Sequence, residues 1–129
     1  MAEDNRIGEV RNRIEKVWLR EDGIVQIVTL PGADYMLADA KQGIASVVQV
    51  SKGKRCPLLV DMRNIKSMDR TARQELAAYT GVTSVAVLVD SPVSRIIGNF
   101  FTAFNKSAVP LRLFSSEAEA TEWLKGFLK

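Results

Sequence analysis

Apolar and polar positions alternate along the chain in blocks, and each block predicts one element of secondary structure. Two apolar runs, at 17–19 and 24–30, flank the tetrapeptide Arg-Glu-Asp-Gly, whose Asp-Gly pair can supply the positive φ that a hairpin turn needs. We therefore expect an antiparallel hairpin near the start of the chain. Residues 10–13 are ambiguous, and residues 1–9 are expected to be disordered.

Farther along, apolar residues recur at intervals of three and four, the period of a helix with one buried stripe. This pattern predicts a helix over 36–50. Short continuous apolar runs then alternate with amphipathic segments, and each segment begins at a capping residue: Asp69, Ser91 before a proline, and Ser115 or Ser116. The expected strands cover 57–62, 83–91 and 109–114, and the expected helices cover 69–79, 91–105 and 115–128.

The order of elements is therefore ββ followed by αβαβαβα, and no internal repeat or linker divides the chain. Such alternation of strand and helix predicts right-handed crossovers and a mostly parallel sheet. We expect one α/β domain over residues 1–129. It should have a mixed, mostly parallel central sheet with an N-terminal β-hairpin and four helices.

Residue composition narrows the chemistry that the chain can perform. The 129 residues are 47% hydrophobic and 26% charged, with a formal net charge of +3, one cysteine and no histidine. Without histidine, Ser-His-Asp and Cys-His arrangements are excluded, and the commonest metal ligand is missing. No glycine-rich phosphate loop is present. We therefore expect a non-enzymatic protein that needs no cofactor and no metal.

Signals for export or membrane insertion are also missing from this sequence. No apolar run has the length of a signal peptide or a membrane span. A single cysteine allows no disulfide within the chain. The sequence therefore predicts a cytoplasmic protein with no integral membrane association.

Asp61 and Asp90 each follow a predicted parallel strand, and ligands of open α/β sheets bind beyond the C-terminal ends of the strands. Two carboxylates there could hold Mg²⁺, with Asp61 as a phosphoacceptor, as in response-regulator receivers. A receiver needs a further acidic pair early in the chain, where this sequence has a hairpin. We therefore favour the simpler interpretation, in which both carboxylates form turn and cap hydrogen bonds.

Three segments together resemble one known family. They read "REDGIVQIVTLPGADYMLADAK" at 20–41, "VDMRNIKSMDRTA" at 60–72 and "PLRLFSSEAEATEWL" at 110–124. With the order of elements, they make the chain similar to the STAS-like proteins, in particular the SpoIIAA-like group, which is related to CRAL-TRIO lipid-binding domains. The resemblance runs from about Val17 to Leu128. It implies a STAS-like fold and a regulatory role through contacts with other proteins.

In STAS-type anti-sigma-factor antagonists, the loop after the equivalent strand reads Met-Asp-Ser-Ser-Gly, and its first serine is phosphorylated. Carried over position by position, Met68 and Asp69 match, Arg70 stands at the phosphoacceptor and Thr71 at the second serine. A guanidinium cannot accept a phosphoryl group, so the resemblance implies a module without the usual phosphoacceptor. Thr71 at a helix N-terminus is open to modification, but an ordinary first-turn residue is the simpler interpretation.

Basic residues concentrate between Lys52 and Arg73. Part of this segment corresponds to the surface that STAS domains present to partners, and its charge suits an acidic protein or an anionic headgroup. No aromatic residue lies within the basic cluster, so nucleic acid is not an expected partner; a solvated face is the alternative interpretation. The expected partner-binding residues are Arg63, Lys66, Asp69, Arg70, Thr71 and Arg73.

The helix expected over 91–105 is apolar around an arc of about 140°, which is broader than contact with one sheet face needs. The apolar surface beyond that need predicts contact with a second copy in a homodimer. Gly98 would also allow another backbone to approach closely. Alternatively, this helix and the helix over 36–48 enclose a small apolar, lipid-like molecule that the protein carries or senses. The residues for either role are Ile96, Ile97, Phe100, Phe101 and Phe104.

Overall fold

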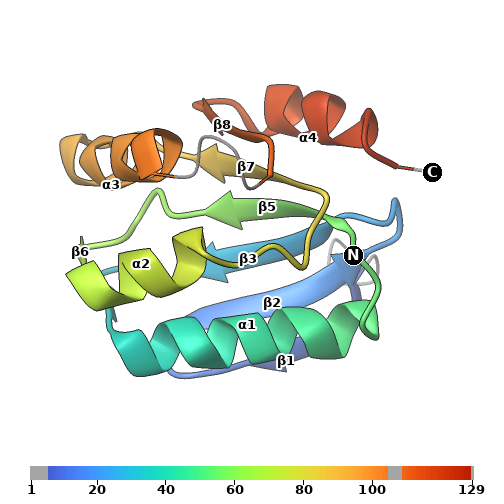
Figure 1. The fold of residues 1–129 in the computed structure, drawn as a ribbon, viewed down its shortest axis with the longest axis horizontal. Coiled ribbons are helices and arrows are strands. Elements are labelled where there is room, and N and C mark those ends of the chain that lie inside the picture. The colour runs from blue at the N-terminus through green and yellow to red at the C-terminus, as the bar shows by residue number, and fades with distance from the viewer. Residues whose placement is uncertain (1–5, 105–108, 129) are drawn as a thin grey trace.

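A six-stranded sheet organises the computed structural model, which describes residues 6–104 and 109–128 (Figure 1). Within these residues the strand order is β1-β2-β3-β5-β7-β8, antiparallel from β1 to β3 and parallel from β3 to β8. The mixed, mostly parallel sheet and the four helices expected from the sequence are therefore confirmed. The strands are β1 (Arg6–Arg11), β2 (Glu15–Arg20), β3 (Val25–Thr29), β5 (Pro57–Asp61), β7 (Ser84–Leu88) and β8 (Leu111–Phe114).

The hairpin between β2 and β3 forms where the Asp-Gly pair predicts it. Gly23 has a φ of 92°, and the turn closes with a 2.8 Å hydrogen bond from the amide of Arg20 to the carbonyl of Ile24. The sequence analysis missed β1, which extends this hairpin into a three-stranded meander. The expectation of disorder over 1–9 is wrong for residues 6–9, which belong to this strand; residues 1–5 lie outside the described residues.

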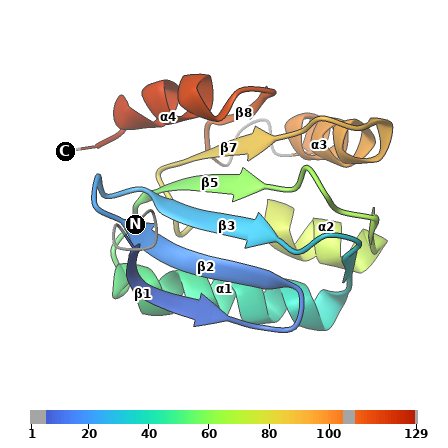
Figure 2. The ribbon, with the colours of Figure 1, turned by 180° about the vertical axis from the view of Figure 1, so that it is seen from behind.

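Three helices cover one face of the sheet and a fourth covers the other. Helices α1 (Leu37–Ser51) and α2 (Arg70–Ala77) lie side by side over one face (Figure 1), and α3 (Pro92–Phe104) contacts α2 and β8. Helix α4 (Glu117–Lys125) packs on β5, β7 and β8 from the opposite side (Figure 2). The alternation of side chains along each strand divides the core accordingly, since Val85 and Val87 point toward α1–α3 while Ala86 and Leu88 pack with α4.

The starts of α1, α2 and α3 meet at the C-terminal ends of the parallel strands. A second, two-residue ladder pairs β4 (Asp34–Tyr35) with β6 (Ser67–Met68), and these strands lead directly into α1 and α2. Helix α3 begins four residues after β7 ends. The turn at 68–71, which aligns with the phosphoacceptor loop of STAS antagonists, is thereby placed at the start of α2, at this end of the sheet.

Candidate functional site

The turn into α2 has the local structure that its sequence predicts. Asp69 is the N-cap of α2, and its carboxylate accepts a 3.2 Å hydrogen bond from the amide of Thr71. The same carboxylate also accepts a hydrogen bond from the hydroxyl of Thr71. These bonds lower the pKa of Asp69, led by the bond from the hydroxyl. Thr71 is exposed, but its hydroxyl is engaged with a negative charge, which disfavours a phosphate at that position.

Arg63 lies apart from the other predicted partner-binding residues. Its guanidinium forms a bidentate pair with Asp61, with distances of 3.0 Å from Nε and 2.8 Å from Nη2, and Nη2 lies 3.7 Å from Glu117 of α4. These contacts raise the pKa of Arg63, led by the hydrogen bond to Asp61. Arg63 therefore joins the end of β5 to the start of α4 on the far face of the sheet.

Arg73 packs against α3 from the neighbouring helix. Its guanidinium carbon lies 5.1 Å from the ring centroid of Phe100, within the range of a cation–π contact. Its Nε atom is buried and has no hydrogen-bond partner within the described residues. Arg73 thus connects α2 to α3, and Phe100 must lie on the flank of α3 that faces α2.

Lys66 and Arg70 are exposed, and neither forms an ion pair within the described residues. Arg70 lies three positions before Arg73, so both project from the same flank of α2, toward α3. Lys66, just before β6, and Arg70, the first residue of α2, are thereby available to an anion from outside the molecule.

Helix α3 presents a second, exposed apolar stripe beside its buried one. Ile97 and Phe101 are 4% and 5% exposed and belong to the core, whereas Val93 and Ile96 are 42% and 65% exposed. Val93, Ile96 and half-buried Phe100 are spaced by three and four residues, so they form one stripe along the flank that faces α2. The side chain of Phe104 lies outside the described residues.

Gly98 is explained by packing within the chain. A Cβ atom at this position would lie 2.9 Å from a methyl group of Leu113 and 3.2 Å from one of Val89. The glycine therefore lets α3 sit close to β7 and β8. The sequence predicts the close approach of another backbone at Gly98, whereas the nearest atoms are side-chain methyl groups of Leu113 and Val89.

Arg70 and Arg73 of α2 and the apolar stripe of α3 lie on neighbouring helices, and with Lys66, which precedes β6, we group them as the helix-start surface. Two of the predicted partner-binding residues, Asp69 and Thr71, lie at its edge, and Arg63 is not part of it. The surface consists of Lys66, Arg70 and Arg73 with Val93, Ile96 and Phe100.

The carboxylate of Asp61 is paired within the chain. The carboxylate of Asp61 accepts hydrogen bonds from the backbone and the side chain of Arg63, as the simpler interpretation of the sequence expects. No group of three or more potential metal-ligating side chains occurs among the described residues.

A buried acidic site beneath α1 was missed in the sequence analysis. Glu15, at the start of β2, is fully buried and accepts a 2.9 Å hydrogen bond from the hydroxyl of Tyr35. Gly43 of α1 lies directly over it, because a Cβ atom there would be 2.5 Å from Oε2 of Glu15 and 2.9 Å from the Tyr35 hydroxyl. Beside them, Arg13 forms a 2.6 Å ion pair with Asp39 in the first turn of α1.

Burial controls the protonation of this site. It raises the pKa of Glu15 to about 7, although hydrogen bonds from Tyr35 and Asn12 favour the ionised form. Burial and the nearby charge of Glu15 likewise raise the pKa of Tyr35. Burial opposes ionisation of Asp39 as well, but the hydrogen bonds from Arg13 and the Met36 amide outweigh it and lower the pKa of Asp39. Glu15 therefore titrates in the neutral range.

The fold is similar to that of proteins whose structures have been solved. A structure from Shewanella loihica PV-4, described as an uncharacterised protein of the DUF3478 family with a SpoIIAA-like fold, matches with a TM-score of 0.57 and 15% identity, over 92% of this chain and 91% of that one. This likeness confirms the SpoIIAA-like fold. A protein of unknown function from Arthrobacter sp. FB24 is 32% identical, over 84% of this chain and 96% of that one, with a TM-score of 0.34.

The family itself is defined by sequence. The model of a domain of unknown function, DUF7793, matches residues 17–128, and the chain belongs to this family. No curated protein matches the sequence. In the described part of the chain, no helix has the length and apolar character that crossing a membrane requires.

Proposed function

We propose that this protein is a non-enzymatic, regulatory interaction module of the STAS type, which binds an acidic segment of a partner protein on the helix-start surface. The observation that carries the proposal is that exposed Lys66 and Arg70 form no ion pair within the described residues, while Arg73, on the same helix as Arg70, packs on Phe100 of the apolar stripe of α3. A complementary segment would present carboxylates to the cations and an apolar side chain to the stripe.

The proposed surface works without a phosphoacceptor. Arg70 stands where STAS antagonists carry the regulatory serine, and the hydroxyl of the adjacent Thr71 is bonded to Asp69. A fixed positive charge at the helix start would attract the carboxylates of a partner at all physiological pH values, because a guanidinium does not lose its proton there. Regulation would then come from partner availability rather than from modification of this loop.

Charge reversal tests the proposal. The double variant Lys66→Glu, Arg70→Glu is expected to lose the partner that wild-type protein captures in cells after in vivo cross-linking, because repulsion replaces attraction at the contact. Its free energy of unfolding should change by no more than about 0.5 kcal/mol, since both side chains are exposed. Arg73 is left in place because it packs on Phe100.

The matched control reverses two exposed cations elsewhere. Lys52 and Lys54 follow the C-terminal end of α1 and are exposed, so Lys52→Glu, Lys54→Glu makes the same change in net charge. This control should capture the partner as wild type does. Equal capture by both double variants, or equal loss in both, would contradict the assignment of the surface.

We propose that the exposed stripe of α3 is also the contact of a homodimer, in which a second copy occupies the stripe in place of the partner's apolar side chain. Ile96→Asp is expected to convert the dimer to a monomer in size-exclusion chromatography with light scattering, because a charge would be buried in the contact. The change should alter the free energy of unfolding of the monomer by about 0.5 kcal/mol or less, because the side chain is 65% exposed. Ile96→Ala, which removes apolar area without adding charge, should weaken the dimer less. An Ile96→Asp variant that remains a dimer would show that the stripe is not the dimer contact.

A further inference from the structure

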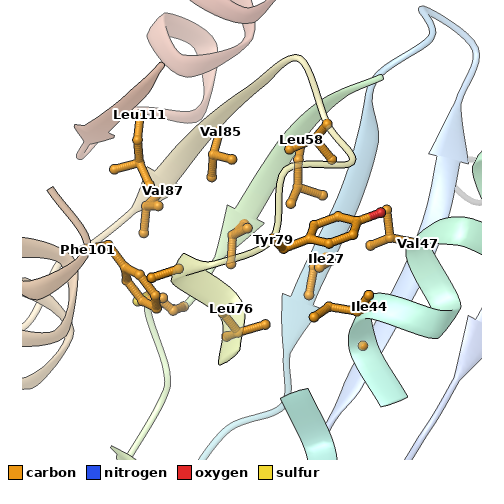
Figure 3. Close-up of a pocket in the computed structure, with 15 residues that line it drawn as sticks. Ile27, Ile44, Val47, Leu58, Leu76, Tyr79, Val85, Val87, Phe101 and Leu111 are labelled. Atoms are coloured by element: carbon orange, nitrogen blue, oxygen red, sulfur yellow. The ribbon is translucent and has the colours of Figure 1, made fainter. Parts of the chain in front are cut away.

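A cavity of about 70 Å³ lies between the sheet and helices α1, α2 and α3 (Figure 3). Its wall is built from side chains of β3, β5, β7 and β8 below and of the three helices above. The lining side chains are hydrocarbon or thioether, apart from the hydroxyl of Tyr79. A buried water molecule needs two to four polar partners, so this cavity is a poor site for water.

The cavity adjoins a surface groove between α1 and α2. Ile44 and Tyr79 line the cavity, and they also line a shallow surface groove between these two helices. In Figure 3 the ring of Tyr79 lies across the cavity toward Val47 of α1. Tyr79 is half-buried and comes two residues after α2 ends, with its ring against Gly81. Rotation of this side chain would connect the groove to the cavity.

We propose that the cavity is a binding site for a small, uncharged apolar molecule, which enters from the α1–α2 groove past Ile44 and Tyr79. The volume sets the size class of this ligand. An apolar cavity of about 150 Å³ in another protein binds benzene or xenon, and this one has roughly half that volume. It is also well below the range that starts at about 300 Å³ for sites of drug-sized ligands. The ligand therefore has few heavy atoms, and a lipid chain is too large.

Xenon is the probe that matches this volume. In methyl-resolved NMR spectra recorded at increasing xenon pressure, we expect saturable shifts in the methyl groups of Ile27, Val85 and Leu111, which line the cavity. Shifts that stay linear with pressure, or that spread equally over surface methyl groups, would overturn the proposal. Crystals pressurised with xenon provide a second readout in wild-type protein, because a bound atom appears as a strong density peak in the cavity.

A filling variant separates cavity binding from contact with the surface. Val87→Ile adds one methylene to the cavity wall and should weaken xenon binding about tenfold, equivalent to about 1.4 kcal/mol. Val48→Ile makes the same chemical change on the exposed side of α1 and should bind xenon as wild type does. Equal affinity for xenon in the two variants would overturn the assignment of the cavity as the binding site.

The entry route is tested by the rate of exchange. Tyr79→Ala should speed xenon exchange between the cavity and solvent, because it removes the side chain that separates cavity and groove. Tyr79→Phe keeps the ring and should exchange at the wild-type rate. The same rate in all three proteins would overturn the route past Tyr79.

Discussion

Replacing Gly43 by alanine is expected to destabilise the protein by about 2–3 kcal/mol, although alanine is the better helix former by about 1 kcal/mol. The reason is steric. The new Cβ atom would lie 2.5 Å from Oε2 of Glu15 and 2.9 Å from the hydroxyl of Tyr35, and both side chains are buried. Either α1 lifts away from β2, or the hydrogen bond between Glu15 and Tyr35 is broken inside the core. Urea denaturation at about pH 6 measures the change.

The control for helix propensity lies two residues farther along the same helix. Ala45 is exposed, so Ala45→Gly should cost about 1 kcal/mol, the ordinary difference between the two residues. The steric explanation is checked by repeating Gly43→Ala in a Glu15→Ala background, where the carboxylate is gone. There the substitution should cost at least about 1 kcal/mol less than in wild type. The same cost in both backgrounds would show that Glu15 is not the obstacle.

Raising the pH from about 5 to about 8 is expected to lower the free energy of unfolding by about 2–3 kcal/mol through Glu15 alone. Its pKa is raised from 4.5 to about 7 in the folded protein. Below pH 4.5 the carboxyl is protonated in both states, and the contribution to stability is complete. Between the two pKa values only the unfolded state releases the proton, so stability falls as the pH rises, and the loss is complete above pH 7. Urea denaturation at a series of pH values measures this slope.

Glu15→Gln isolates this contribution. The amide keeps an acceptor for Tyr35 but does not titrate, so the pH dependence above pH 5 should become nearly flat and stability at pH 8 should rise, by about 2 kcal/mol. Asp39 acts in the opposite direction and in another range, because its pKa is lowered and its contribution is lost only as the pH falls through that value. Parallel curves for wild type and Glu15→Gln would contradict the assignment to Glu15.

The helices could be predicted well because their signals are local. The helix expected over 36–50 is α1 (Leu37–Ser51), and the one expected over 91–105 is α3 (Pro92–Phe104). Their limits follow from apolar spacing and from caps, which depend on a few neighbouring residues. For α4 the sequence predicts Ser115 or Ser116 as the N-cap. The cap is Ser116, whose hydroxyl accepts a 3.3 Å hydrogen bond from the amide of Glu119.

The buried acidic site could not be predicted in the same way, although part of its signal is present. Glu15, Val17 and Leu19 alternate along β2, and this spacing places the glutamate on the same face of the sheet as two core residues. Its partner Tyr35 lies twenty residues away, on a two-residue strand that only tertiary pairing creates. Sequence spacing gives no indication of such a contact, so the charged residue was not recognised as buried.

The basic cluster shows a similar limit of sequence analysis. Arg63 and Arg70 are seven residues apart, and both were expected on one surface. Arg63 instead pairs with Asp61 and Glu117 near α4, whereas Arg70 is exposed beside α3. The chain turns between the two residues, so that their side chains lie on different faces of the molecule, one near α4 and one beside α3. Charge counted along the chain therefore overestimates the charge available at the surface.

The two outer strands of the sheet have a consequence for behaviour at high concentration. Strand β1 carries a bulge between Ile7 and Val10, with Gly8 at a φ of 66°, and it exposes Glu9 and Arg11. Strand β8 has only four residues and follows Pro110. A bulged, charged edge and a very short one are poor templates for adding a strand from another molecule. The native protein should therefore resist stacking into cross-β aggregates, because neither edge of its sheet readily pairs with a strand of another molecule.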